Sequence, residues 1–139
     1  MILLDTMVLS ELRKARPNPG VVTYLTNQAA GAIFISVLTI GEIEAGIERQ
    51  RSQNVSSADE LAQWLVVMEL QFADCILPVT PAIARLWGRL CVQTGNSGVD
   101  NLIAATALCH NLTVVTRNLK HFAPTGARTV DPFSPVFML

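Results

Sequence analysis

Four residues with oxygen-bearing side chains stand at the boundaries of apolar runs in this chain. They are Asp5, Glu42, Asp100 and Asn118. In a parallel α/β sheet the carboxyl ends of the strands share one edge, where ligands bind. Residues far apart in the sequence can therefore converge there. Carboxylates that meet repel one another unless a cation balances them, and hard oxygen ligands suit Mg²⁺ or Mn²⁺. The sequence thus predicts a divalent-metal site.

Such a site suits hydrolysis of a phosphodiester bond. A divalent ion lowers the pKa of a bound water and holds the scissile phosphate, so no Ser, Cys or His nucleophile is needed. No overall basic field draws in nucleic acid, because the formal net charge is −1. Contacts to phosphate must therefore come from local basic clusters. The candidates are Arg13, Lys14 and Arg16, Arg49 and Arg51, and Arg117 with Lys120.

Each acid also has a structural interpretation. Thr39 and Glu42 have the spacing of a capping box, and Asp100 is in place to cap the helix that follows it. Asp5 is harder to explain in this way, because Thr6 could cap the next helix without burying a charge. Glu11 could point back toward the rim of the site, and His121 could contact substrate.

The elements that must position these residues alternate between strands and helices. Short apolar runs predict strands at 2–4, 32–36, 76–79, 113–116 and 127–130. Helical spacing predicts helices from Thr6, over 21–27, from the capping box to about 50, over 58–73, from Pro81, and over 101–110. This alternation indicates a three-layer α/β/α fold with a mostly parallel sheet of about five strands. We expect residues 1–139 to form one domain.

Composition places the chain among compact globular proteins, with 50% apolar and 15% charged residues. Three cysteines without paired spacing predict small buried apolar residues in a reducing compartment. No basic leader precedes the first strand, and no apolar run has the length of a membrane span. We therefore expect a cytoplasmic protein without membrane contact.

Four blocks of the sequence resemble the PIN-domain ribonucleases, and among them the VapC and FitB type toxins of bacterial toxin–antitoxin pairs. The blocks are MILLDTMVLSE (1–11), SVLTIGEIEAG (36–46), DNLIAATA (100–107) and LTVVTRN (112–118). They follow the family's order along almost the whole chain. One block alone would be a weak signal, whereas four in order are fairly specific.

The resemblance implies a PIN-like fold and a Mg²⁺- or Mn²⁺-dependent endoribonuclease that acts as the toxin of a type II pair. It places the metal-binding acids at Asp5, Glu42 and Asp100, Asn118 at a fourth position that is often Asp, and Thr116 as a hydrogen-bonding support. It also implies single-stranded or looped RNA as substrate, a homodimer, and a VapB- or FitA-like antitoxin. The apolar tail over 132–139 would otherwise need a cover on a monomer.

Two departures from the family pattern support an alternative. Met7 stands where an Asn is usual, and His121 stands where an acid often precedes Phe122. With Asn118 in addition, the alternative is a catalytically weakened PIN-fold module that binds antitoxin or RNA. A phosphoryl-transfer enzyme of the haloacid dehalogenase type would need a second Asp at the position of Met7.

Overall fold

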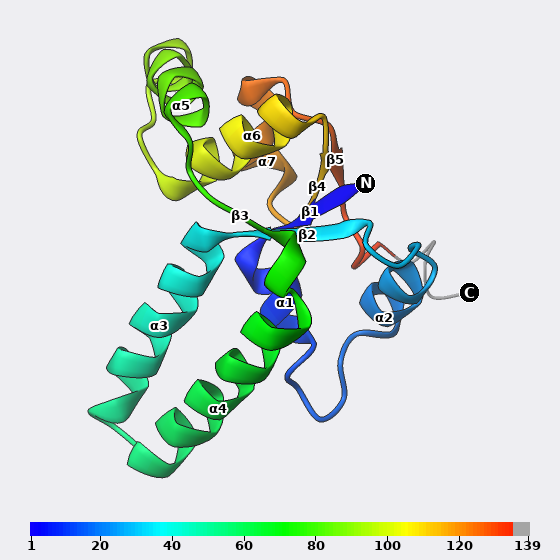
Figure 1. Cartoon of the computed structure of the whole chain (residues 1–139), viewed down its shortest axis with the longest axis vertical. Helices are drawn as coiled ribbons and strands as arrows, with labels where there is room; N and C mark the ends of the chain where they lie inside the picture. Colours follow the sequence, from blue (N-terminus) through cyan, green and yellow to red (C-terminus); the bar gives the residue numbers. More distant parts are fainter. Residues whose placement is uncertain (135–139) are drawn as a thin grey trace.

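A five-stranded parallel sheet forms the centre of the computed structural model, which describes residues 1–134 (Figure 1). The strand order is β3-β2-β1-β4-β5, and every neighbouring pair is parallel. The strands are β1 (Ile2–Leu4), β2 (Ile33–Ser36), β3 (Ile76–Leu77), β4 (Thr113–Val115) and β5 (Thr129–Val130). The predicted parallel sheet of about five strands is confirmed.

Helices cover both faces of this sheet, as Figure 1 shows for α3 and α4 on one side and α5 and α6 on the other. The helices are α1 (Thr6–Glu11), α2 (Pro19–Thr26), α3 (Val37–Arg51), α4 (Val55–Gln71), α5 (Pro81–Thr94), α6 (Val99–His110) and α7 (Leu119–Phe122). Two short 3₁₀ turns, η1 (Ala73–Cys75) and η2 (Ala123–Thr125), complete the order.

The core is split by the sheet into two apolar clusters, and the central strand contributes to both. Ile2 and Leu4 pack into the cluster formed with α1 to α4, whereas Leu3 packs into the cluster formed with α5 to α7. Successive side chains of a strand point to opposite faces, so a strand covered on both sides must be apolar throughout. This explains why the β1 sequence is continuous Ile-Leu-Leu up to Asp5.

Helices α2 and α4 begin at Pro19 and Val55, two and three residues before their predicted starts, and the starts of α3 and α6 also differ from the prediction. Helix α3 begins at Val37, where the Ser36 Oγ accepts a hydrogen bond from the Leu38 backbone N–H at 3.1 Å. Thr39 therefore lies inside the helix, and the capping-box interpretation of Glu42 is wrong. Helix α6 has Gly98 at its N-cap, so Asp100 lies in its first turn rather than at the cap. Neither acid has the structural role that its spacing offered.

Other features bear on the sequence-based expectations. Cys75 and Cys91 are half-buried and Cys109 is exposed, so the expected burial of all three is wrong. Within residues 1–134, none of the helices has the length and apolar character that crossing a membrane requires. In the apolar tail, Phe133 packs against the α1 to α4 cluster, whereas 135–139 lie outside the described residues.

Candidate active site

Asp5 lies at the carboxyl end of the central strand, and its position follows from the strand register. Leu4 pairs with Val115 across β1 and β4, so the next residues, Asp5 and Thr116, are neighbours. The Asp5 backbone N–H donates to the Val115 carbonyl at 2.9 Å. The side chain of Asp5 is only 6% exposed, so a carboxylate is buried at the edge where α/β sheets bind ligands.

Both carboxylate oxygens of Asp5 accept hydrogen bonds. Oδ1 accepts from the Thr6 backbone N–H at 2.9 Å, which makes Asp5 the N-cap of α1. Oδ2 accepts from the buried Thr116 hydroxyl at 2.7 Å. The Thr116 oxygen in turn accepts from the Asn118 backbone N–H at 2.9 Å. Thr116 thus couples Asp5 to the turn that carries Asn118, whose side chain makes no capping bond to α7.

Glu42 approaches the same region from the second turn of α3. Its Oε1 lies 2.5 Å from the hydroxyl of Thr6, which donates to it. The Thr6 oxygen also lies 3.1 Å from the hydroxyl oxygen of the buried Thr39. Thr39 and Glu42 are three residues apart on one helix and therefore share a face. Thr6 links that face to the first turn of α1.

Asp100 approaches from the first turn of α6 and contacts His121 on α7. Its Oδ2 lies 2.8 Å from the His121 Nδ1. The Asp100 side chain is 29% exposed and that of His121 is 61% exposed, so this pair lies at the solvent-facing rim. His121 therefore reaches one of the predicted metal ligands, a contact that was not predicted from the sequence.

The pKa of Asp5 depends on its burial and on the charges of Glu42 and Asp100. Burial raises the pKa of Asp5 above its ordinary value of 3.8, and the negative charges of Asp100 and Glu42 raise it further. The hydrogen bonds from Thr116 and the Thr6 backbone oppose this rise. Asp5 is thus a buried carboxylate in the field of two other acids.

The chemistry of this donor set fits a hard divalent cation. Among residues 1–134, however, no three acidic, His or Cys side chains are already grouped as metal ligands. In this conformation Glu42 is engaged by Thr6 and Asp100 by His121. The fold therefore brings the predicted acids to one edge of the sheet, with Asp5 near both Glu42 and Asp100. Their side chains are not arranged as a complete set of metal ligands.

Glu11, which was expected to point toward the rim of the site, instead makes local contacts. Glu11 is 7% exposed, and its oxygens accept from Lys14 Nζ at 2.8 Å and from the Asn18 backbone N–H at 2.9 Å. It thus fixes the α1–α2 connection.

Sequence reasoning missed the link from Thr6 and Thr39 to Glu42. The spacing of Thr39 and Glu42 was a signal for it, but it was assigned to a cap.

Comparison with known proteins adds a family match. A family model described as the PIN domain matches residues 2–125. The VapC ribonuclease Y4jK of Sinorhizobium fredii is 31% identical over 97% of this chain and 99% of its own length.

Solved structures are similar over a comparable span. The FitAcB crystal structure from Neisseria gonorrhoeae matches with a TM-score of 0.84 and 30% identity, over 96% of this chain and 99% of the other. A toxin–antitoxin complex from Klebsiella pneumoniae matches with a TM-score of 0.65 and 26% identity, over 95% of this chain and 98% of the other.

Proposed function

Because the chain belongs to the PIN-domain family, we propose that it is a metal-dependent endoribonuclease that acts as the toxin of a type II toxin–antitoxin pair. The observation that carries the proposal is the buried Asp5 carboxylate, held by Thr116 in the field of Asp100 and Glu42. Similarity to a protein named VapC ribonuclease and to a chain of a toxin–antitoxin complex supports the substrate and the biological role.

In this proposal Asp5, Glu42 and Asp100 hold Mg²⁺ or Mn²⁺. A divalent ion held there supplies an activated water and a counter-charge for the scissile phosphate. Thr116 fixes the Asp5 carboxylate, and Thr6 orients Glu42 by its hydroxyl. Asn118 has a neutral amide that can both donate and accept, so it suits contact with a phosphate oxygen. No residue of the chain needs to act as the nucleophile.

The test is cleavage of a total RNA preparation by metal-stripped protein, with Mg²⁺ or Mn²⁺ added back. We expect fragments that require the metal and that disappear in Asp5→Asn. Asp74→Asn is the matched control. Asp74 is exposed and precedes β3, so it lies at the amino ends of the parallel strands, whereas Asp5 lies at their carboxyl ends. Fragments that persist in Asp5→Asn would contradict the proposed site.

The alternative is a PIN-fold module that binds antitoxin or RNA without cleaving it. Its support is the side chain of Met7, which is 39% exposed two residues after Asp5 and offers no hydrogen bond there. A folded protein that yields no fragments with either metal would favour this alternative.

We also propose a VapB- or FitA-like antitoxin as partner, a homodimer, and a cytoplasmic location. Similarity to FitAcB and to the toxin–antitoxin complex supports the partner. Co-expression with the product of the adjacent reading frame, followed by affinity capture and light scattering, tests both assemblies. Capture of no partner and a monomeric mass would contradict them.

A further inference from the structure

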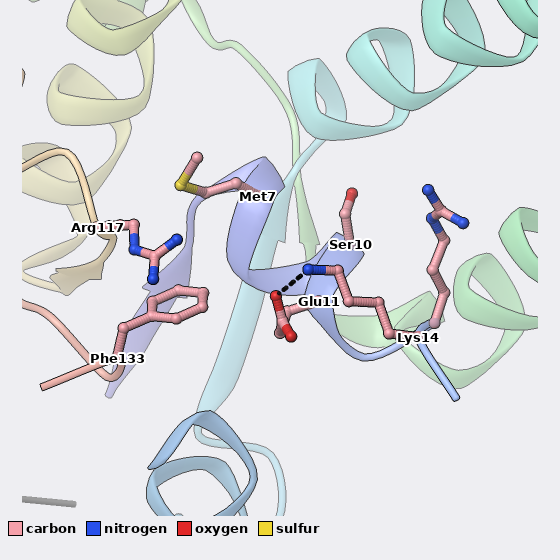
Figure 2. Close-up of a pocket in the computed structure, with 7 residues that line it drawn as sticks. Met7, Ser10, Glu11, Lys14, Arg117 and Phe133 are labelled. Carbon is pink, nitrogen blue, oxygen red and sulfur yellow. Dashed lines mark hydrogen bonds and ion pairs between the residues drawn. The ribbon is translucent and has the colours of Figure 1, made fainter. Parts of the chain in front are cut away.

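A pocket adjoins the candidate active site, and we call it the arginine pocket (Figure 2). It has a volume of about 220 Å³ and is lined by Met7, Ser10, Glu11, Arg13, Lys14, Arg117 and Phe133. Drug-sized ligands occupy pockets of roughly 300–1,000 Å³. The arginine pocket is smaller, so it suits one group of a longer chain rather than a whole ligand.

The charge of this pocket is positive, although the protein as a whole carries −1. Three of its residues are cationic, and its one carboxylate, Glu11, is engaged by Lys14 at 2.8 Å. Within residues 1–134, neither Arg13 nor Arg117 has an ion-pair partner. Two guanidinium groups are thus available to an anionic ligand.

Arg117 and Phe133 form a preset stack on one wall of the pocket. The Arg117 guanidinium carbon lies 4.0 Å from the centre of the Phe133 ring, and Figure 2 shows the two facing each other across from Glu11. The ring covers one face of the planar guanidinium. Arg117 is an exposed residue, so its guanidinium can be reached by a planar group of a ligand. Nucleic-acid bases stack on arginine planes in this way.

The position of this stack relative to the active site is set by the chain itself. Arg117 lies between Thr116, which binds Asp5, and Asn118. Met7 follows Asp5 by two residues on α1 and lies beside Arg117 in Figure 2. A polymer that crosses the candidate site would therefore pass its neighbouring unit into the arginine pocket.

We propose that the arginine pocket is a nucleotide subsite for single-stranded RNA, in which one base beside the scissile phosphate stacks on Arg117. Phe133 supports the guanidinium from behind, and Arg13 contacts a flanking phosphate. The inference rests on the proposed ribonuclease function, because it names where that substrate is held. It assigns Arg117 and Phe133 a base-stacking role that the metal-binding acids cannot provide.

The test measures binding without cleavage, in the Asp5→Asn background. A short fluorescein-labelled single-stranded oligoribonucleotide is titrated with protein and followed by fluorescence anisotropy. We expect R117A to weaken binding about 5- to 100-fold, the range that loss of one stacked base predicts. R89A, which removes an exposed arginine on α5, is the charge-matched control and should bind as the parent does.

A second comparison separates stacking from charge. R117K keeps the positive charge and loses the planar group, so it should weaken binding of the RNA. It should bind a ribose-phosphate strand that lacks bases as tightly as the parent does. F133L, which keeps an apolar side chain in the core, should also weaken RNA binding. Equal RNA affinity in R117A, F133L and R89A would overturn the proposal.

The two proposals fail in distinguishable ways. If the wild type cleaves RNA while R117A leaves both affinity and KM unchanged, only the subsite is wrong. If the wild type does not cleave but Arg117-dependent RNA binding is present, only the nuclease function is wrong. Arg117-dependent binding of a polyglutamate peptide, with no binding of RNA, would overturn the subsite and assign the pocket to an acidic peptide.

Discussion

Asp5 meets two conflicting demands. As the N-cap of α1 and the acceptor of the Thr116 hydroxyl, it is part of the local structure. As a carboxylate that is 6% exposed near Asp100 and Glu42, it is costly to ionise without a cation. Thr6 could have supplied a cap at lower cost. The presence of a buried acid at this position is best explained by function.

Replacing Asp5 by Asn should stabilise the metal-free protein at neutral pH. Burial, together with Asp100 and Glu42, raises the folded pKa of Asp5 above the unfolded value of 3.8. The Asp5 carboxyl therefore stays protonated to a higher pH in the folded state than in the unfolded state. The free energy of unfolding thus falls as pH rises from 3.8 through the folded pKa. Urea unfolding in chelator should show a stability gain in Asp5→Asn at neutral pH that vanishes below pH 3.8. A loss at neutral pH would contradict the shift.

Replacing Thr116 by Val should act on the same carboxylate in the opposite direction. The Thr116 hydrogen bond lowers the pKa of Asp5, so its loss raises that pKa further. The acid limb of the pH–activity profile should then move to higher pH, and stability at neutral pH should fall by about 1.5–3 kcal/mol. Thr116→Ser keeps the hydroxyl and serves as control. An unmoved acid limb in Thr116→Val would show that this bond does not tune Asp5.

At this scale the sequence predicts positions better than contacts. The resemblance implied Thr116 as a support of the site, and the parallel register of β1 and β4 places it beside Asp5. The partners of Glu42 and Asp100 could not be predicted. Thr6 and His121 reach them only through side-chain rotamers and helix placement. Arg117 was expected to contact phosphate. Its stack on Phe133 was not predicted, because it depends on where the chain runs after β5.

At the scale of elements, the α1–α2 connection is held by one buried side chain. Glu11 accepts from the Asn18 backbone N–H at 2.9 Å, next to the N-cap that begins α2. This connection also carries Arg13 and Lys14 on the wall of the arginine pocket. The geometry of the pocket therefore depends on Glu11.

Replacing Glu11 by Ala should destabilise the protein by about 1–3 kcal/mol, because the Asn18 N–H loses its acceptor. Glu11→Gln keeps an acceptor and should lose less. The Lys14 contact, the Asn18 bond and the nearby Arg117 charge lower the pKa of Glu11 below 4.5, against the effect of burial. Its stabilising effect is thus complete above pH 4.5 and is lost as pH falls through the folded pKa. Urea unfolding across that range checks this, and equal losses in both variants would contradict the acceptor role.

Strands were predicted well where both faces are covered, and helix starts less well. The runs of β1 and β4 are apolar because each contributes to both clusters. The start of α3 was wrong because the capping-box spacing of Thr39 and Glu42 also places two residues on one helical face. Ser36, at the end of a buried strand, takes the cap instead. Strands β3 and β5 have two residues each, too few for a pattern to define their ends.

At the scale of the whole molecule, the all-parallel sheet explains why the acids converge. Every strand delivers its carboxyl end to one edge, so Asp5, Glu42 and Asp100 arrive there from β1, α3 and α6. This convergence was predictable from the alternation of strands and helices alone. On the proposed function, the charge concentrated there predicts that a bound cation stabilises the fold.

Added Mn²⁺ should therefore stabilise the whole protein, and the effect should require Asp5. A ligand that binds only the folded state at 100 times its Kd adds about 2.7 kcal/mol of stability. We expect the Tm of the wild type and of Asp74→Asn to rise with Mn²⁺ concentration and that of Asp5→Asn to stay constant. The order of stability should then invert, because Asp5→Asn is the more stable variant in chelator and loses that advantage as Mn²⁺ binds the others. Equal Tm shifts in all three proteins would place the bound ion elsewhere and remove the basis for assigning Asp5 to the metal site.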